Sequence, residues 1–155
     1  MRNNIRYTVV RAVAVAGAFG LLAGCQTMHN MMGGAEAKSM RGETVTLSGN
    51  NEVPPSGSSA SGTAHVTVHE DCTVNADVSV SGMTATAAHI HTGAAGANGP
   101  VAVPFNKTGD NAFAAASGAK MNAEQCAAYK AGNTYVNVHS AAKPGGEVRA
   151  QLRGR

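Results

Sequence analysis

The residues of this chain best suited to chemistry are two histidines, His89 and His91, in the stretch AHIHTG at positions 88–93. A single residue separates them, in a chain with only six histidines. On a β-strand, side chains two residues apart point to the same face, about 6 to 7 Å apart at the backbone. One metal ion could reach both rings, and imidazole is a common ligand of Cu(II) and Zn(II). The spacing predicts part of a metal site. A structural role, with both rings bonded to carbonyls of the Gly-rich turn that follows, is the alternative.

Two further histidines are candidates for the same site. His139 lies in the stretch YVNVHS, on the polar face of an expected strand and opposite the apolar Val136 and Val138. His65 lies on the polar face of the stretch TAHVTVHE, in which alternate residues are apolar. If neighbouring strands bring these faces together, three or four imidazoles would surround one ion. We expect copper as the metal, with zinc less favoured.

The elements that must position these side chains are short strands. From Glu43 onward apolar and polar residues alternate in the stretches ETVTLSG, TAHVTVHE, TVNADVSVSG, TYVNVHS and EVRAQL, and AHIHT, VAVPF and NAFAAAS are shorter candidates. Segments rich in Gly, Pro, Ser and Asn separate them. The pattern predicts an all-β fold, an antiparallel Greek-key-like sandwich or barrel.

One segment, MNAEQCAAYKAG at positions 121–132, instead predicts a short helix. Asn122 is a suitable N-cap, Gln125 occupies the capping-box position, and Gly132 is a stop signal. The helix would lie across the strands and complete a single domain over residues 43–155, which is long enough for one hydrophobic core.

The first 24 residues have the pattern of a secretory signal. Three arginines precede an apolar run, AVAVAGAFGLLA, that is too short to span a bilayer as a stable transmembrane helix. The run ends in LLAGC, which resembles a bacterial lipobox and implies a lipid on Cys25. Gln26 stands where an aspartate would favour the inner membrane, so we expect an outer-membrane lipoprotein that faces the periplasm or the cell surface. Residues 25–42 would be a flexible tether between the lipid and the domain.

Two cysteines remain once Cys25 is acylated, namely Cys72 and Cys126. An even pair in an oxidising compartment predicts a disulfide, here between the helix and a strand. Two thiolate metal ligands are the weaker alternative, because neither cysteine belongs to a C-x-x-C pair.

The charge balance argues against nucleic acid as a partner. The whole chain has 12 Lys and Arg against 9 Asp and Glu. Removal of the signal takes away Arg2, Arg6 and Arg11, so the mature chain has a formal net charge of zero. No basic patch with interleaved aromatic residues is present in the sequence.

Three ordered blocks of the sequence resemble the CHRD domain. They are TLSGNNEVPP (46–55), AAHIHTGAAGANGPVAVPF (87–105) and TYVNVHSAAKPGGEVRAQL (134–152), within a similarity that covers about residues 43–153. The resemblance implies an all-β domain and little about chemistry. His65 and His69 depart from the family pattern, which more often has small or acidic residues at those positions.

A weaker similarity is to copper/zinc superoxide dismutase. It rests on the H-x-H strand, a late VH strand and a nearby G-x-R segment. By this analogy His89, His91 and His139 would be copper ligands, with His65 as a possible fourth. Arg149 would guide an anion to an open coordination position. The zinc-binding loop of that family has no counterpart after His91, so a copper-only form is implied.

Together these patterns predict an envelope-anchored CHRD lipoprotein that binds copper through histidines, for sequestration or protection. The lipid attaches it to a membrane, and the sequence identifies no protein partner. A copper-dependent enzyme similar to superoxide dismutase is the first alternative. A metal-free structural or adhesion module is the second.

Overall fold

The computed structural model describes residues 42–154. The expected signal peptide, most of the tether and Cys25 lie outside the described residues. Eight strands, one 3-10 turn (η1, Gly49–Asn51) and one helix (α1) follow one another along the chain. The strands are β1 (Glu43–Ser48), β2 (Ser61–Val68), β3 (Val74–Ser81), β4 (Ala85–Thr92), β5 (Val101–Gly109), β6 (Ala112–Ala115), β7 (Thr134–Ser140) and β8 (Val148–Leu152).

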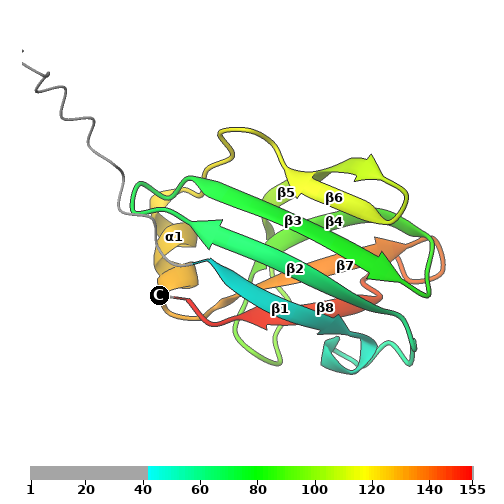
Figure 1. Ribbon diagram of the computed structural model, residues 1–155. Coiled ribbons are helices and arrows are strands. Elements are labelled where there is room, and N and C mark those ends of the chain that lie inside the picture. The colour runs from blue at the N-terminus through cyan, green and yellow to red at the C-terminus, as the bar shows by residue number, and fades with distance from the viewer. Residues whose placement is uncertain (1–41, 155) are drawn as a thin grey trace, which may run out of the picture. The chain divides into compact units, whose positions relative to one another are not determined.

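All eight strands form one closed antiparallel barrel in the order β1-β2-β3-β6-β5-β4-β7-β8 (Figure 1). Consecutive strands pair except at two places, where the chain crosses from β3 to β4 and from β6 to β7. The prediction of an antiparallel Greek-key-like sandwich or barrel with one short helix is confirmed, in its barrel form.

The apolar face of each strand fills the inside of the barrel. In β2, Ala64, Val66 and Val68 are buried, as the alternation in the sequence predicts. Phe113 and Ile90 enter the same core from β6 and β4. Burying one such large side chain contributes roughly 1.5 to 3 kcal/mol. The core therefore uses the inward face of β4 and β7, which leaves their histidines on the outside.

The crossing from β3 to β4 is held by one side chain. Asn111, at φ 56° in the β5–β6 turn, donates a hydrogen bond to the Met83 carbonyl and accepts one from the Ala85 amide. Asparagine tolerates this left-handed backbone conformation better than most residues. The contact fixes the start of β4, the strand that bears two of the candidate ligands.

The crossing from β6 to β7 contains α1 (Ala123–Lys130). Its first turn has the expected capping box between Asn122 and Gln125. A disulfide joins Cys126 on α1 to Cys72 in the β2–β3 turn, so the predicted pairing is confirmed. Within the described residues, no helix is long and apolar enough to cross a membrane.

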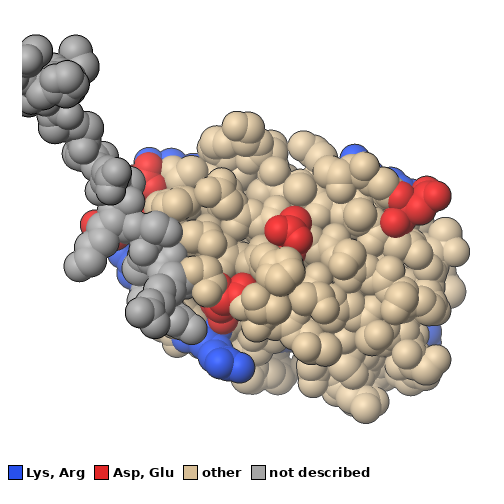
Figure 2. Space-filling view, viewed as in Figure 1, with Lys and Arg blue, Asp and Glu red and all other residues tan. Residues whose placement is uncertain are grey.

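Three loops cover the outer face of β7 and β8, and we call them the three-loop cap. They comprise residues 49–60, 93–100 and 141–147. Under them Tyr135 and Asn137 of β7 are buried although both point away from the barrel core. Figure 2 shows the face of the barrel formed by β1, β2 and β3. Charged residues are scattered over this face and form no continuous basic surface.

Candidate metal centre

Two adjacent strands bring three of the histidines together. His89 and His91 lie on the outer face of β4, and His139 lies on the outer face of β7. In the β4–β7 register His89 is opposite Asn137, and His139 is opposite Ala87. His139 is thus a diagonal neighbour of His89, close enough for large side chains to meet. One ring nitrogen from each histidine lies within 4.8 Å of the other two.

The distances within this cluster suit a common ion. His89 Nδ1 lies 3.0 Å from His139 Nε2. Imidazole nitrogens bind zinc at about 2.0 to 2.1 Å, and two such nitrogens at about 90° to one another would be about 3 Å apart. The His89 ring centroid is 5.4 Å from that of His91 and 4.9 Å from that of His139. The three rings therefore surround a small common space.

Two backbone carbonyls of the cap orient two of the rings. Nδ1 of His91 lies 3.0 Å from the Gly99 carbonyl oxygen, and Nδ1 of His139 lies 3.0 Å from the Pro144 carbonyl oxygen. A carbonyl only accepts, so each Nδ1 must donate its proton. Each neutral ring then has its lone pair on Nε2, and in His139 this atom lies 3.0 Å from His89 Nδ1. Hydrogen bonds of this kind fix the tautomer of metal-binding histidines.

One nitrogen of the cluster has no protein partner. His91 Nε2 is buried and makes no hydrogen bond within the described part of the chain. Leaving a buried acceptor unsatisfied costs about 1 to 3 kcal/mol. A metal ion at the cluster would satisfy this lone pair, so the donor set fits such a group.

The cluster also keeps its imidazoles neutral. Burial, together with the charges of His139 and His91, lowers the pKa of His89 from 6.5 to about 4. Burial likewise lowers the pKa of His91 and His139, against the opposing hydrogen bonds to Gly99 and Pro144. Near pH 7 all three rings are unprotonated, the form that binds a metal.

A stack of three side chains supports His91. The Tyr135 ring lies parallel to the His91 ring, at 6° and 4.9 Å between centroids. The Arg149 guanidinium carbon lies 3.4 Å from the centroid of the Tyr135 ring. The Tyr135 hydroxyl accepts a hydrogen bond from the Gly99 amide. The carbonyl of the same glycine binds His91. The sequence placed Tyr135 on this face but gave no sign of the stack.

Arg149 is an organiser of the cap in this structure. Its side chain is only 2% exposed. The guanidinium donates to the side chains of Asn98 and Gln151 and to the carbonyls of Ala94 and Ala97. These bonds fix the loop 93–100, whose Gly99 carbonyl orients His91. The sequence predicted that Arg149 guides an anion to the metal. In the structure its guanidinium is buried and hydrogen-bonded to the cap.

A buried carboxylate lies beneath the cap, and the sequence analysis missed it. Glu52 accepts a hydrogen bond of 2.5 Å from the Asn137 side-chain amide. Burial raises the pKa of Glu52 from 4.5 to about 7, against the lowering effect of the Arg149 charge. The only signal in the sequence was an acidic residue within the otherwise uncharged block TLSGNNEVPP.

The structure does not bring the fourth predicted ligand to the cluster. His65 lies on the exposed outer face of β2, where its Nδ1 is 2.9 Å from the Thr44 hydroxyl. Two strands, β1 and β8, separate β2 from β7 in the barrel. His69 is also elsewhere, with its Nε2 2.9 Å from the Asn75 amide nitrogen.

The fold and the site together define a closed antiparallel β-barrel with three histidines gathered on its outer face. The family model for the CHRD domain matches residues 44–152. The chain therefore belongs to the CHRD family, as the three sequence blocks predicted. No curated protein and no solved structure matches the chain.

Proposed function

We propose that the chain binds one copper ion through His89, His91 and His139, and that it holds copper at the cell envelope. The observation that carries the proposal is the buried, unpartnered Nε2 of His91 in a cluster of three neutral imidazoles. Carbonyls of the cap bind Nδ1 of His91 and of His139, which leaves the lone pair of each neutral ring on Nε2.

Copper is preferred over zinc on chemical grounds. The cluster offers imidazole nitrogens only, and these are ligands for both metals. Among divalent first-row metals a given nitrogen site binds Cu(II) most tightly. Zinc is therefore the weaker competitor and serves as the comparison metal in the test below.

The envelope location rests on two independent features. The sequence begins with a signal-like segment that ends in LLAGC. The domain contains a disulfide, and disulfides persist in oxidising compartments outside the cytosol. A domain tethered by a lipid at Cys25 would keep its cluster in the periplasm or at the cell surface.

Dismutation of superoxide is the second candidate, because three ligands leave room for a small molecule on the metal. That reaction also benefits from a positive charge that attracts the anion. Arg149 is buried and hydrogen-bonded to the cap, so it supplies no exposed charge at the cluster. Sequestration is accordingly the primary proposal.

The proposal is tested by equilibrium dialysis of the purified protein, expressed from the full chain, against Cu(II) and separately against Zn(II). We expect one copper per chain after dialysis. The combined substitution His89→Ala and His91→Ala should abolish retention, and His139→Ala should weaken copper binding at least 10-fold. His65→Ala is the matched control, because it removes an imidazole on the same barrel away from the cluster.

Failure of wild-type protein to retain copper would refute the proposal. Equal retention by the variant lacking His89 and His91 would also refute it, as would a loss caused by His65→Ala alone. A superoxide decay assay on the loaded protein then separates the two metal functions: copper without turnover eliminates the enzyme, and turnover that disappears with the histidines supports it.

A further inference from the structure

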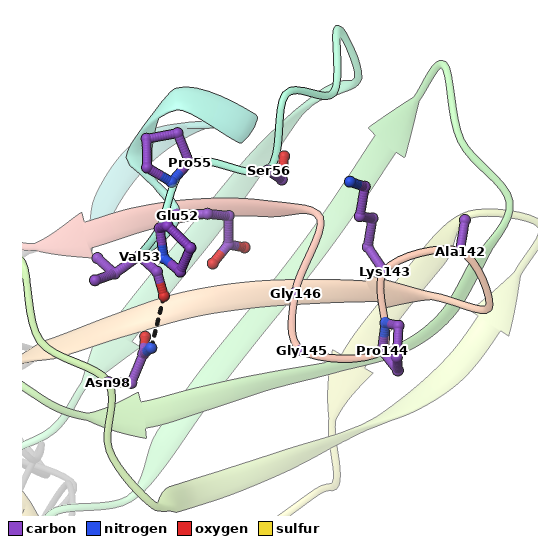
Figure 3. Close-up of a pocket in the computed structure, with 11 residues that line it drawn as sticks. Glu52, Val53, Pro55, Ser56, Asn98, Ala142, Lys143, Pro144, Gly145 and Gly146 are labelled. Carbon is purple, nitrogen blue, oxygen red and sulfur yellow. Dashed lines mark hydrogen bonds between the residues drawn. The ribbon is translucent and has the colours of Figure 1, made fainter.

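A cavity lies under the three-loop cap (Figure 3). It is next to the cluster of three histidines, but none of these histidines lines it. Its volume is about 340 Å³, near the lower end of the range for small-molecule sites. Two loops of the cap supply most of its walls, and Asn98 contributes from the third. The lining residues are Glu52, Val53, Pro54, Pro55, Ser56, Asn98, Ala142, Lys143, Pro144, Gly145 and Gly146.

The cavity is built around the Glu52 carboxylate. This side chain is 6% exposed, and Figure 3 shows its oxygens directed into the space between Val53 and Gly146. Oε1 accepts from the Asn137 amide, whereas Oε2 has no hydrogen-bond donor among the described residues. A buried carboxylate with an oxygen left over is unusual, because buried charges are generally paired.

Gly146 makes the close approach to this carboxylate possible. A Cβ atom at this position would lie 2.7 Å from Glu52 Oε1 and 2.9 Å from Oε2. The backbone here has φ 131°, a conformation that favours glycine. Glycine at this position therefore lets the loop 141–147 pass close to both carboxylate oxygens.

The nearest cations do not bind Glu52 directly. The hydrogen bonds of Arg149 go to the loop 93–100 and to Gln151, so this guanidinium acts on Glu52 only through space. The Lys143 side chain extends from the β7–β8 loop towards Ser56 at the edge of the cavity (Figure 3). The free carboxylate oxygen remains available to a donor from outside.

We infer that this cavity is a binding site for an organic ammonium group, which would donate its hydrogen bonds to Glu52 Oε2. An ammonium carries three donors on one compact charge, and the single free oxygen matches one of them. The side chains of Val53, Pro54 and Pro144 offer apolar surface to the aliphatic part of such a ligand. None of the three clustered histidines lines this cavity.

The raised pKa of Glu52 reflects a buried carboxylate that no cation among the described residues contacts directly. Burial raises this pKa from 4.5 to about 7, because removal from water disfavours the charged form. The charge of Arg149, from β8, favours ionisation of this carboxyl. A bound ammonium would add a further positive charge and favour the ionised form more strongly.

The test is an NMR titration of the protein, without added metal, with n-butylammonium as the probe and n-butanol as its uncharged counterpart. We expect saturable shifts of the backbone amides of Gly145, Gly146 and Asn98 with butylammonium at pH 8. The same concentration of butanol should produce shifts at least 10-fold smaller.

Two variants locate the effect. Glu52→Gln keeps the shape and the acceptor for Asn137 but removes the charge, and it should abolish saturable binding. Glu70→Gln, an exposed residue in the β2–β3 turn, is the matched control and should bind as the wild type does. Amide spectra of both variants verify that each one is folded.

Binding by Glu52→Gln equal to that of the wild type would overturn the inference, as would equal affinity for butanol or the absence of saturation. Lys143→Met should bind butylammonium at least as well as the wild type, because it removes a like charge; loss of binding in this variant would also contradict the site. None of these outcomes depends on copper, so the ammonium-site proposal and the metal proposal can be refuted independently of each other.

Discussion

At the scale of single residues, the two ring nitrogens of His91 have different surroundings. Nδ1 donates to the Gly99 carbonyl, and Nε2 is buried with no partner among the described residues. A purely structural histidine, bonded to loop carbonyls as the alternative interpretation supposes, would account for the first nitrogen and not for the second. His139 is likewise bonded to a loop carbonyl, that of Pro144, through Nδ1, but its Nε2 lies 3.0 Å from His89 Nδ1. The residue chemistry therefore favours a ligand over a loop anchor.

The raised pKa of Glu52 predicts how the stability of the protein without ligand depends on pH. The pKa of this carboxyl is about 4.5 in the unfolded chain and about 7 in the folded protein. As pH rises through this window the unfolded chain releases the proton while the folded chain retains it. The carboxyl thus contributes stability that is fully present below pH 4.5 and is lost as pH rises through about 7.

We expect Glu52→Gln to remove this dependence. The free energy of unfolding of the variant, minus that of the wild type, should rise by about 3 kcal/mol between pH 4.5 and pH 8. Urea titrations across this range measure it, and the subtraction cancels the opposite contribution of the histidines, whose pKa values are lowered. A flat difference for Glu52→Gln would show that the carboxyl is not perturbed by the fold.

At the scale of elements, the cap loop 93–100 connects several parts of the site. Its Gly99 carbonyl holds His91, its Gly99 amide binds Tyr135, and its Asn98 binds both Arg149 and the Val53 carbonyl. A Cβ atom at Gly99 would collide with the Thr92 carbonyl oxygen. The loop has no freedom to accept a side chain there without moving the carbonyl that orients His91.

Gly99→Ala should therefore lower copper affinity although it removes no ligand. We expect a loss of 10-fold to 100-fold, the usual effect of disturbing a hydrogen-bond partner of a metal ligand, measured by competition with a chromophoric chelator. Gly109→Ala is the control, because a Cβ atom there would meet only Ala112, at an ordinary 3.8 Å. Unchanged affinity in Gly99→Ala would mean that the loop does not position His91.

The strands were predictable from the sequence and the cap was not. Alternation in TAHVTVHE and TYVNVHS correctly assigned Val66 and Val136 to the core, because a strand has only two faces. The same rule placed Tyr135 and Asn137 outside, where loops from elsewhere in the chain bury them. Such burial depends on contacts between distant segments, as in the bond from Asn98 to Val53, which local periodicity does not encode.

The grouping of histidines shows the same limit. The prediction that His89, His91 and His139 meet depended on β4 and β7 being neighbours, which the barrel order confirms. His65 looked equally suitable on its polar strand face, but β2 occupies another part of the barrel. Face assignment came from the sequence, whereas strand order required the structure.

At the scale of the whole molecule, the disulfide and the loop that orients His139 are at different ends of the barrel. The disulfide ties the β2–β3 turn to α1, and α1 precedes β7 (Figure 1). The loop that orients His139 follows the other end of β7. A disulfide with a sequence separation of 54 residues is expected to contribute about 4 kcal/mol in the chain-entropy model.

Replacing both cysteines by serine should thus lower the free energy of unfolding by about 4 kcal/mol without changing the amount of copper bound by the folded protein. Chemical denaturation measures the first quantity, and dialysis at a temperature where the variant is folded measures the second. Loss of copper binding in a variant with native amide spectra would show that the two ends of the barrel are coupled.

The central claim is that three imidazoles share one copper ion. Anomalous diffraction at the copper edge, from crystals of the protein loaded with Cu(II), tests it most directly. We predict one strong peak at about 2.0 to 2.1 Å from one nitrogen each of His89, His91 and His139, with Nδ1 of His91 and His139 still bonded to Gly99 and Pro144. A peak at any other position, or no peak in crystals loaded with excess copper, would contradict the account.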